Sequence, residues 1–218
     1  MADIKITPPE IPDGLYEIPD AESFMMEAHS GGILDGCRIC GVILNGNEIR
    51  YPSAAYGAFD NCRFGKVRFI RGSFSDVRFK NCDFSGCDLS EAGFRRCAFI
   101  NCKAVGTDFS GSSFIDATFD NCAMAYANFT KAKFEYARLS DSVFSDGDFS
   151  GCTFNKLQLS HSDFTRASFA FTKLCGIDFT SCDIDGITVS DGFSELRGAV
   201  VTDYQASRLA SLLGLVIR

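Results

Sequence analysis

The chain has 218 residues and a net charge of −7 at neutral pH, with 22 Phe, 11 Cys and no Trp. Because 46% of the residues are hydrophobic and 22% are charged, it can form a packed core, which excludes disorder of the whole chain. The acidic balance also disfavours direct nucleic-acid binding, since an acidic surface gains nothing from counterion release at phosphates.

No apolar stretch approaches the ~18 residues that a membrane-spanning helix needs. The first twenty residues have neither the basic region nor the apolar region of a signal peptide. We therefore expect a cytoplasmic protein without a membrane partner, whose cysteines stay reduced.

Residues 1–33 form an N-terminal extension that holds four of the five prolines together with Phe24, Met25 and Met26. After it, apolar residues recur at every fifth position, weakly at first, through Leu34, Ile39, Leu44, Ile49 and Ala54. Residues 46–58, around Tyr51-Pro52, are the least regular, and whether they project as a loop stays open. Since a solenoid needs its open ends covered, we expect residues 1–33 to cap the first coil.

From Phe59 to Val189 every fifth residue is apolar, which makes 27 consecutive positions that contain 19 of the 22 Phe. Two residues before each of them lies a small residue, at 24 of the 27 positions. Neither the helical period of 3.6 nor the strand period of 2 fits this pattern. A polygonal coil fits it, because each five-residue side then turns one small and one large side chain inward.

A longer period of twenty residues gives the number of sides. The dipeptide Asn-Cys recurs at Asn61, Asn81, Asn101 and Asn121, so equivalent polar residues stack in successive coils and can form side-chain ladders. Twenty residues per coil means four sides, which predicts an all-β solenoid of square cross-section over residues 34–195. The 32 pentapeptides from residue 34 to residue 189 predict about eight coils.

Cysteine spacing suggests packing rather than chemistry. Cys37 and Cys40 form a CxxC pair, but no second ligand pair at matching spacing accompanies them. Nine of the eleven cysteines, all but Cys40 and Cys175, fall on the small inward position. We therefore expect buried free thiols, no metal site and no cofactor.

The five-residue register breaks at Ser190–Glu195, and residues 196–218 form a C-terminal cap. Thr202 or Asp203 can cap a short helix whose apolar residues follow helical spacing, and Gly214 can end it. The tail Leu215-Val216-Ile217 is too apolar to extend freely into water.

Units such as Thr107-Asp108-Phe109-Ser110-Gly111 and Gly147-Asp148-Phe149-Ser150-Gly151 resemble the pentapeptide-repeat proteins. That resemblance implies a right-handed quadrilateral β-helix. Residues 201–207 and 212–217 resemble the C-terminal cap of the Qnr- and MfpA-like quinolone-resistance proteins, which implies a tail-to-tail homodimer. The implied interface consists of Tyr204, Leu209, Leu212, Leu213, Leu215 and Ile217.

The same resemblance implies a DNA mimic that binds the type II topoisomerases DNA gyrase and topoisomerase IV and protects them from fluoroquinolones. Charge is distributed accordingly: residues 59–103 carry 9 basic and 5 acidic groups, whereas residues 104–189 carry 6 and 11. Tail-to-tail pairing would place the acidic halves at the dimer centre. The candidate contacts are Asp88, Glu91, Asp108, Asp116, Asp146 and Asp148, although Asp is also part of the repeat consensus.

No Ser-His-Asp, HExxH, GxGxxG or P-loop pattern occurs, so we do not expect an enzyme. The unbroken register from residue 34 to residue 189 excludes a projecting loop unless its length is a multiple of five, unlike the loop-bearing Qnr proteins. Self-immunity against a gyrase-poisoning toxin, gyrase inhibition without drug protection, and a structural module with another partner remain alternatives.

Overall fold

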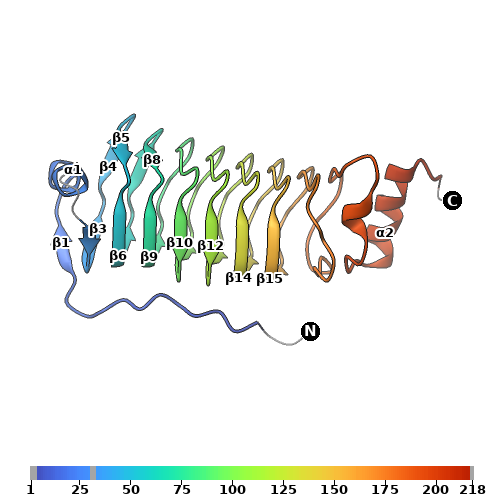
Figure 1. Ribbon diagram of the computed structural model, residues 1–218, viewed down its shortest axis with the longest axis horizontal. Coiled ribbons are helices and arrows are strands. Elements are labelled where there is room, and N and C mark those ends of the chain that lie inside the picture. Colours follow the sequence, from blue (N-terminus) through green and yellow to red (C-terminus); the bar gives the residue numbers. More distant parts are fainter. Residues whose placement is uncertain (1–3, 30–32, 217–218) are drawn as a thin grey trace.

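The computed structural model describes residues 4–29 and 33–216. It is a rod in which short parallel strands stack along the long axis, with helix α1 near one end and helix α2 at the other (Figure 1). The strands are β1 (Tyr16–Ile18), β2 (Ile33–Asp35), β3 (Cys37–Cys40), β4 (Ile43–Asn45), β5 (Glu48–Arg50), β6 (Ser53–Asp60), β7 (Arg63–Gly65), β8 (Arg68–Ile70), β9 (Ser73–Lys80), β10 (Gly93–Arg95), β11 (Ala98–Ile100), β12 (Ser113–Ile115), β13 (Thr118–Asp120), β14 (Lys133–Ser140) and β15 (Thr153–Ser160). The helices are α1 (Ala21–His29) and α2 (Asp203–Ala210), with 3-10 turns η1 (Ser194–Leu196) and η2 (Ser211–Leu213).

Strands pair with an offset of twenty residues, as the repeat predicts. Phe94 of β10 lies opposite Phe114 of β12, and Phe114 lies opposite Phe134 of β14, always in parallel. Single parallel bridges continue the same offset on the other sides of the coil, as in Asp108↔Asn128. The predicted square β-solenoid is confirmed, and β5 and β6 stay in register, so residues 46–58 form no projecting loop.

Corners recur at every fifth residue in the left-handed backbone region. At one of them Gly86 has φ +69°, and the amide of Cys87 donates to the carbonyl of Phe84 at 2.9 Å, which closes a four-residue turn. A turn of this kind needs a positive φ at its third residue, so Gly, Asn and Asp are favoured there. Phe171 also adopts a positive φ, of 62°, at another corner, although its side chain is bulky. This side chain is 79% exposed.

Phenylalanine rings fill the interior in stacked columns. The rings of Phe94 and Phe114 lie 5.0 Å apart and 4° from parallel, and those of Phe99 and Phe119 lie 4.7 Å apart and 2° from parallel. Rings on adjacent sides meet edge to face, as Phe114 and Phe119 do at 68°. Both arrangements are favoured by the quadrupole of an aromatic ring.

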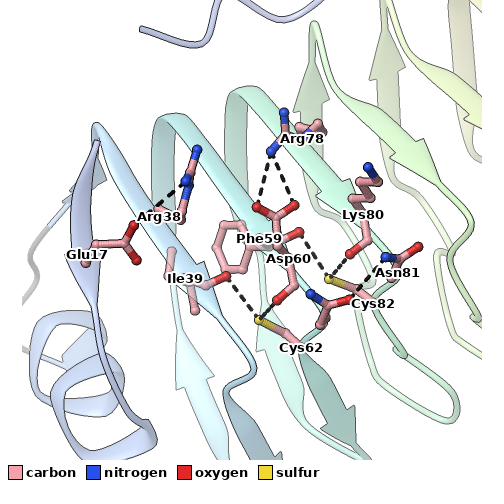
Figure 2. Close-up of polar contacts among 11 residues, drawn as sticks. Glu17, Arg38, Ile39, Phe59, Asp60, Cys62, Arg78, Lys80, Asn81 and Cys82 are labelled. Atoms are coloured by element: carbon pink, nitrogen blue, oxygen red, sulfur yellow. Dashed lines mark hydrogen bonds and ion pairs between the residues drawn. The ribbon is translucent and has the colours of Figure 1, made fainter. Parts of the chain in front are cut away.

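Cysteine thiols occupy the small inward positions and bond to the backbone of the preceding coil. The thiol of Cys62 donates to the carbonyl of Ile39 at 3.4 Å, and that of Cys82 donates to the carbonyl of Phe59 at 3.3 Å (Figure 2). Burial raises the pKa of the Cys87 thiol to about 12. All eleven cysteines are free, and only Cys40 and Cys175 are exposed, as the spacing predicts.

At the N-terminal end, β1 pairs with β3 and the buried ring of Phe24 in α1 packs against Phe59 and Phe64 of the first coils. We expected residues 1–33 to cap the first coil, but the stretch before β1 does not lie over it. Residues 4–12 run back along the outside of the rod toward its C-terminal half (Figure 1). We call them the N-terminal arm.

At the C-terminal end, Thr202 caps α2, and its hydroxyl and the Gln205 side chain form a reciprocal capping box. The Gln205 amide also donates to the carbonyls of Phe179 and Cys182, at 2.9 and 2.8 Å, which fastens the cap to the last coil. Gly214 ends the helical segment in the left-handed conformation. The predicted capped helix ending at Gly214 is therefore confirmed.

The solenoid has about seven turns rather than the eight expected. On two of its four sides, residues 173–180 leave the ladder and make no backbone pair with β15. On its other edge this segment is paired, since Asp178 forms a parallel bridge with Val200 of the C-terminal cap. The break in the ladder thus lies between β15 and residues 173–180, which stay paired with the cap on their other edge.

Replacing a column ring should destabilise the fold far more than replacing a surface ring. Phe114→Ala removes a fully buried side chain with rings above and below it, and we expect a loss of about 3–5 kcal/mol in unfolding free energy. Urea denaturation measures it. Phe171→Ala is the control and should change stability by no more than ~0.5 kcal/mol; equal effects would contradict the ring-column account.

Candidate functional site

Three of the six acidic candidates share one column on one side of the rod. Asp88 and Asp108 are direct neighbours in the ladder, and Asn128 separates Asp108 from Asp148. The Oδ1 of each aspartate accepts the amide of the residue two positions later, at 3.0, 2.9 and 2.8 Å respectively. These carboxylates therefore stabilise turns while their charge stays partly exposed.

Asp146 occupies the corner next to that column. The guanidinium of Arg166 donates to both of its carboxylate oxygens, at 2.7 and 2.6 Å, and holds the pKa of Asp146 below its ordinary value. This charge is partly neutralised within the rod.

Three further carboxylates, which the sequence analysis did not select, lie beside that corner. Asp163 and Asp183 stack on the side that leads into it, and each accepts the amide two residues later. Asp185 pairs with Arg208 of α2 at 2.7 Å. The twenty-residue spacing of Asp163 and Asp183 is the signal that could have identified them.

We name this group the acidic corner. It consists of Asp108, Asp146, Asp148, Asp163, Asp183 and Asp185. Within the described ranges, four of its members form no salt bridge: Asp108, Asp148, Asp163 and Asp183. Uncompensated negative charge is thus concentrated in the C-terminal half.

Glu91 and Asp116 lie away from the acidic corner. Glu91 is on a neighbouring corner and pairs with Arg71 at 2.7 Å. Asp116 is on the opposite corner, where its Oδ1 accepts the amide of Thr7 in the N-terminal arm at 2.9 Å. The structure therefore does not gather all six candidates into one site.

Several basic residues of the front half pair with carboxylates of the same chain. Arg78 donates to both oxygens of Asp60 at 3.2 Å, and Arg38 lies 3.9 Å from Glu17 (Figure 2). Arg68 similarly contacts Glu48 at 2.6 Å. These pairs reduce the positive charge that the segment presents to a partner.

Asp76, on the same corner as Asp116, anchors the N-terminal arm and is fully buried. Its Oδ1 accepts from Arg96 Nε at 2.6 Å and from the amide of Glu10 at 3.1 Å. Burial raises the pKa of Asp76, but hydrogen bonds from Arg96, Glu10 and Ser75 lower it by more, so the net pKa lies below its ordinary value.

Residues of the expected dimer interface lie at the C-terminal end. Tyr204 and Leu215 are 73% and 58% exposed. Leu209 packs partly against the core and Leu212 is half-buried. The Leu213 side chain and Ile217 lie outside the described part of the structure.

The family of the chain follows from a model of the pentapeptide repeat region, which matches residues 72–143 and 112–192. Together these ranges cover more than half of the sequence. The chain belongs to the pentapeptide-repeat family. No curated protein matches it significantly.

One solved structure supports the fold, and two others are similar at lower TM-scores. HetL, a pentapeptide-repeat protein involved in heterocyst differentiation regulation in the cyanobacterium Nostoc sp. strain PCC 7120, is 15% identical with a TM-score of 0.51, covering 79% of this chain and 81% of its own. Trypsin-treated QnrB1, a plasmid-mediated fluoroquinolone resistance protein, is 21% identical with a TM-score of 0.44, covering 83% and 100%. Full-length QnrB1 is 22% identical with a TM-score of 0.40, covering 92% and 95%.

Within residues 4–29 and 33–216, no helix has the length and apolar character to cross a bilayer. In the same ranges, no group of three or more His, Cys, Asp or Glu side chains could hold a metal ion.

Removing the Asp76 carboxylate should destabilise the protein in a pH-dependent way. A group with a depressed folded-state pKa stabilises above its unfolded pKa and loses that contribution as pH falls through the folded value. We expect Asp76→Asn to lower the unfolding free energy by about 3 kcal/mol at neutral pH, because Arg96 loses its buried partner. The difference from wild type, measured by urea denaturation, should shrink as pH falls below ~4.

Asp13→Asn, at an exposed position near the other end of the arm, is the matched control and should be neutral within ~0.5 kcal/mol. If the loss of unfolding free energy in Asp76→Asn stayed constant down to acid pH, the charge of the Asp76 carboxylate would not contribute to stability.

Proposed function

We propose that this protein is a DNA-mimicking homodimer that binds bacterial type II topoisomerase and protects it from fluoroquinolones. Members of the pentapeptide-repeat family are generally structural or interaction modules. The observation that supports the specific function is the acidic corner, which lies in the half of the rod next to an exposed apolar end.

Pairing through the C-terminal end accounts for that apolar surface. Tyr204, Leu215 and Val216 are exposed by 73%, 58% and 84%, and they belong to one short terminal segment. A second copy would cover them, as homodimer interfaces cover apolar side chains. The cap sequence resembles the cap through which Qnr-type proteins pair.

Such a dimer places two acidic corners around its centre. Residues 108–185 span about four coils, or roughly 18 Å at ~4.8 Å per coil. Six carboxylates over that length give one charge per about 3 Å, close to the ~3.4 Å per strand of duplex DNA. Arg166 and Arg208 offset two of them and dilute the net density to one per ~5 Å. A protein channel that binds DNA phosphates would be attracted to this surface.

Toxin immunity and gyrase inhibition would use the same surface and differ only in the consequence of binding. A structural module with another partner is the alternative from a different class. The turn-stabilising bonds of Asp108 and Asp148 favour that alternative, because they give these carboxylates a role in the fold itself.

Charge can be removed from the acidic column without losing its turns. Asn128 occupies this column, and its side-chain oxygen accepts the Thr130 amide at 3.0 Å, as the aspartates do for theirs. The double variant Asp108→Asn/Asp148→Asn should therefore fold normally, yet bind gyrase at least tenfold more weakly. Supercoiling by gyrase in the presence of ciprofloxacin, with added protein, measures the protection.

Asp35→Asn combined with Glu17→Gln removes the same charge near the N-terminal end and should protect as well as wild type. If the wild-type protein neither protects nor inhibits gyrase, topoisomerase is rejected as the partner. Equal protection by both double variants would reject the acidic corner as the contact surface.

Disrupting the apolar end should produce monomers. We expect wild type to be a dimer at micromolar concentration by light scattering, and Leu215→Asp to be a folded monomer, because a buried unpaired charge opposes association. Met26→Asp places the same charge on an exposed residue at the other end and should remain dimeric. A monomeric wild type would exclude the long-rod arrangement.

A further inference from the structure

The backbone ladder is broken on two sides of the rod, between β15 and residues 173–180. In intact coils the amide of the large inward residue donates to the following coil, as Phe144 does to the carbonyl of Asp163 at 2.7 Å. In the described part of the chain, no backbone hydrogen bond joins β15 to residues 173–180. A groove lies between these two segments instead.

The other two sides of the same turn keep their backbone pairs. The amide of Phe164 donates to the carbonyl of Asp183 at 2.7 Å, and the amide of Thr188 donates to the carbonyl of Ala167 at 2.9 Å. The last turn is therefore attached along two sides and separated along the other two. This is the geometry of a hinge, in which a few residues along one line absorb the rotation of a larger part.

Residues 173–180 are bonded to the C-terminal cap rather than to the coil before them. The amide of Gly176 donates to the carbonyl of Gly198 at 2.8 Å. Gly198 also packs so closely that a Cβ atom there would lie 2.9 Å from the sulfur of Cys175. The segment and the cap should therefore move together, and we call residues 173–216 the terminal unit.

Inward side chains at the broken sides are less well covered than their equivalents deeper in the rod. Phe134 and Leu139 are each 1% exposed, whereas Phe154 and Leu159, twenty residues later, are only partly buried. The ring of Phe154 also meets that of Phe134 at 64°, while the Phe114 and Phe134 rings are 18° from parallel. Apolar surface and backbone groups are therefore both left to be covered at the groove.

We propose that the terminal unit is hinged along its two paired sides and rotates between the open arrangement described above and a closed one. In the closed state residues 173–180 pair with β15. The twenty-residue period fixes the register of that pairing, so Cys175 lies opposite Asn155. The two paired sides already hold this register, and rotation alone brings the partners together.

Opposing contacts balance the two states. Closing forms backbone hydrogen bonds between β15 and residues 173–180 and covers Phe154 and Leu159, which favours the closed state. Ile4 of the N-terminal arm lies in the lining of the groove, and closing displaces it, which favours the open state. A mixture of the two states is therefore expected.

The hinge sets the direction of the C-terminal end of the rod. Because α2 and η2 belong to the terminal unit, its rotation tilts them relative to the long axis. In the dimer proposed above, that tilt would change the angle between the two rods. This consequence rests on the proposed dimer, whereas the hinge itself does not.

Disulfide trapping detects the closed state, because Cys175 is an exposed native thiol. Paired strands lie ~4.8 Å apart, within the ~4.4–6.8 Å between Cα atoms that a disulfide spans. In a Cys40→Ser background, we expect Asn155→Cys to form a disulfide with Cys175 within one chain under mild oxidation. Peptide mass spectrometry of the monomeric band identifies the bond.

A reference pair in the same column controls for geometry. Glu135 and Asn155 lie opposite each other in the ladder, and the Asn155 amide donates to the Glu135 carboxylate at 3.3 Å. Glu135→Cys combined with Asn155→Cys, in a Cys40→Ser/Cys175→Ser background, should therefore form its disulfide. If this bond forms but Asn155→Cys and Cys175 are not joined within one chain, the closed state is overturned.

Hydrogen exchange detects the open state. In wild type, the amides of Phe154 and Leu159 should exchange at least tenfold faster than those of Phe134 and Leu139, because the latter belong to a strand paired on both edges. The disulfide to Cys175 should remove this difference. Equally slow exchange of both pairs in wild type would overturn the open state, and fast exchange that persists in the trapped protein would overturn the hinge. Neither measurement depends on topoisomerase binding.

Discussion

The structure depends on one packing constraint: each five-residue side turns one small and one large side chain into a square interior, and equivalent side chains stack about 4.8 Å apart. Phe satisfies this constraint well, since flat rings can stack face on face, as Phe99 and Phe119 do at 4.7 Å. Small cysteines fit beside the rings, with thiols donating to backbone carbonyls. The register, the corners and the need for end caps all follow from this stacking.

The same constraint organises the surface, because every outward residue belongs to a column. Asp88, Asp108 and Asp148 share a column because they are separated by multiples of twenty residues. The column makes each aspartate serve two purposes, since one carboxylate oxygen fixes a turn while the charge remains at the surface. Electrostatic recognition can therefore develop on this scaffold without disturbing the core.

The solenoid, its four sides, the buried cysteines and the capped C-terminal helix could be predicted because each depends on local spacing. The Asn61–Asn81 ladder, with a 3.1 Å amide bond, follows from the same period. The path of the N-terminal arm could not be predicted, since backbone amides of Thr7 and Glu10 make its contacts and leave no side-chain pattern. The split between β15 and residues 173–180 could not be predicted either, because the five-residue period continues unchanged through both segments.

The candidate surface was predictable only in part for a related reason. The twenty-residue period predicts that Asp108 and Asp148 share a column. It does not predict the contact of Asp116 with the N-terminal arm, which is more than a hundred residues away in the sequence. The spacing also places Asp163 and Asp183 in one column, but it does not distinguish them from other aspartates that stabilise turns. Folding the columns around a common corner is what brings them beside Asp146.

Competition with DNA for gyrase tests the central claim most directly. The binding of labelled protein to gyrase should be displaced by duplex DNA and should weaken steeply as salt rises, because both ligands would occupy one positively charged surface. Binding that persists unchanged with saturating DNA and at high salt, or no binding at all, would contradict DNA mimicry.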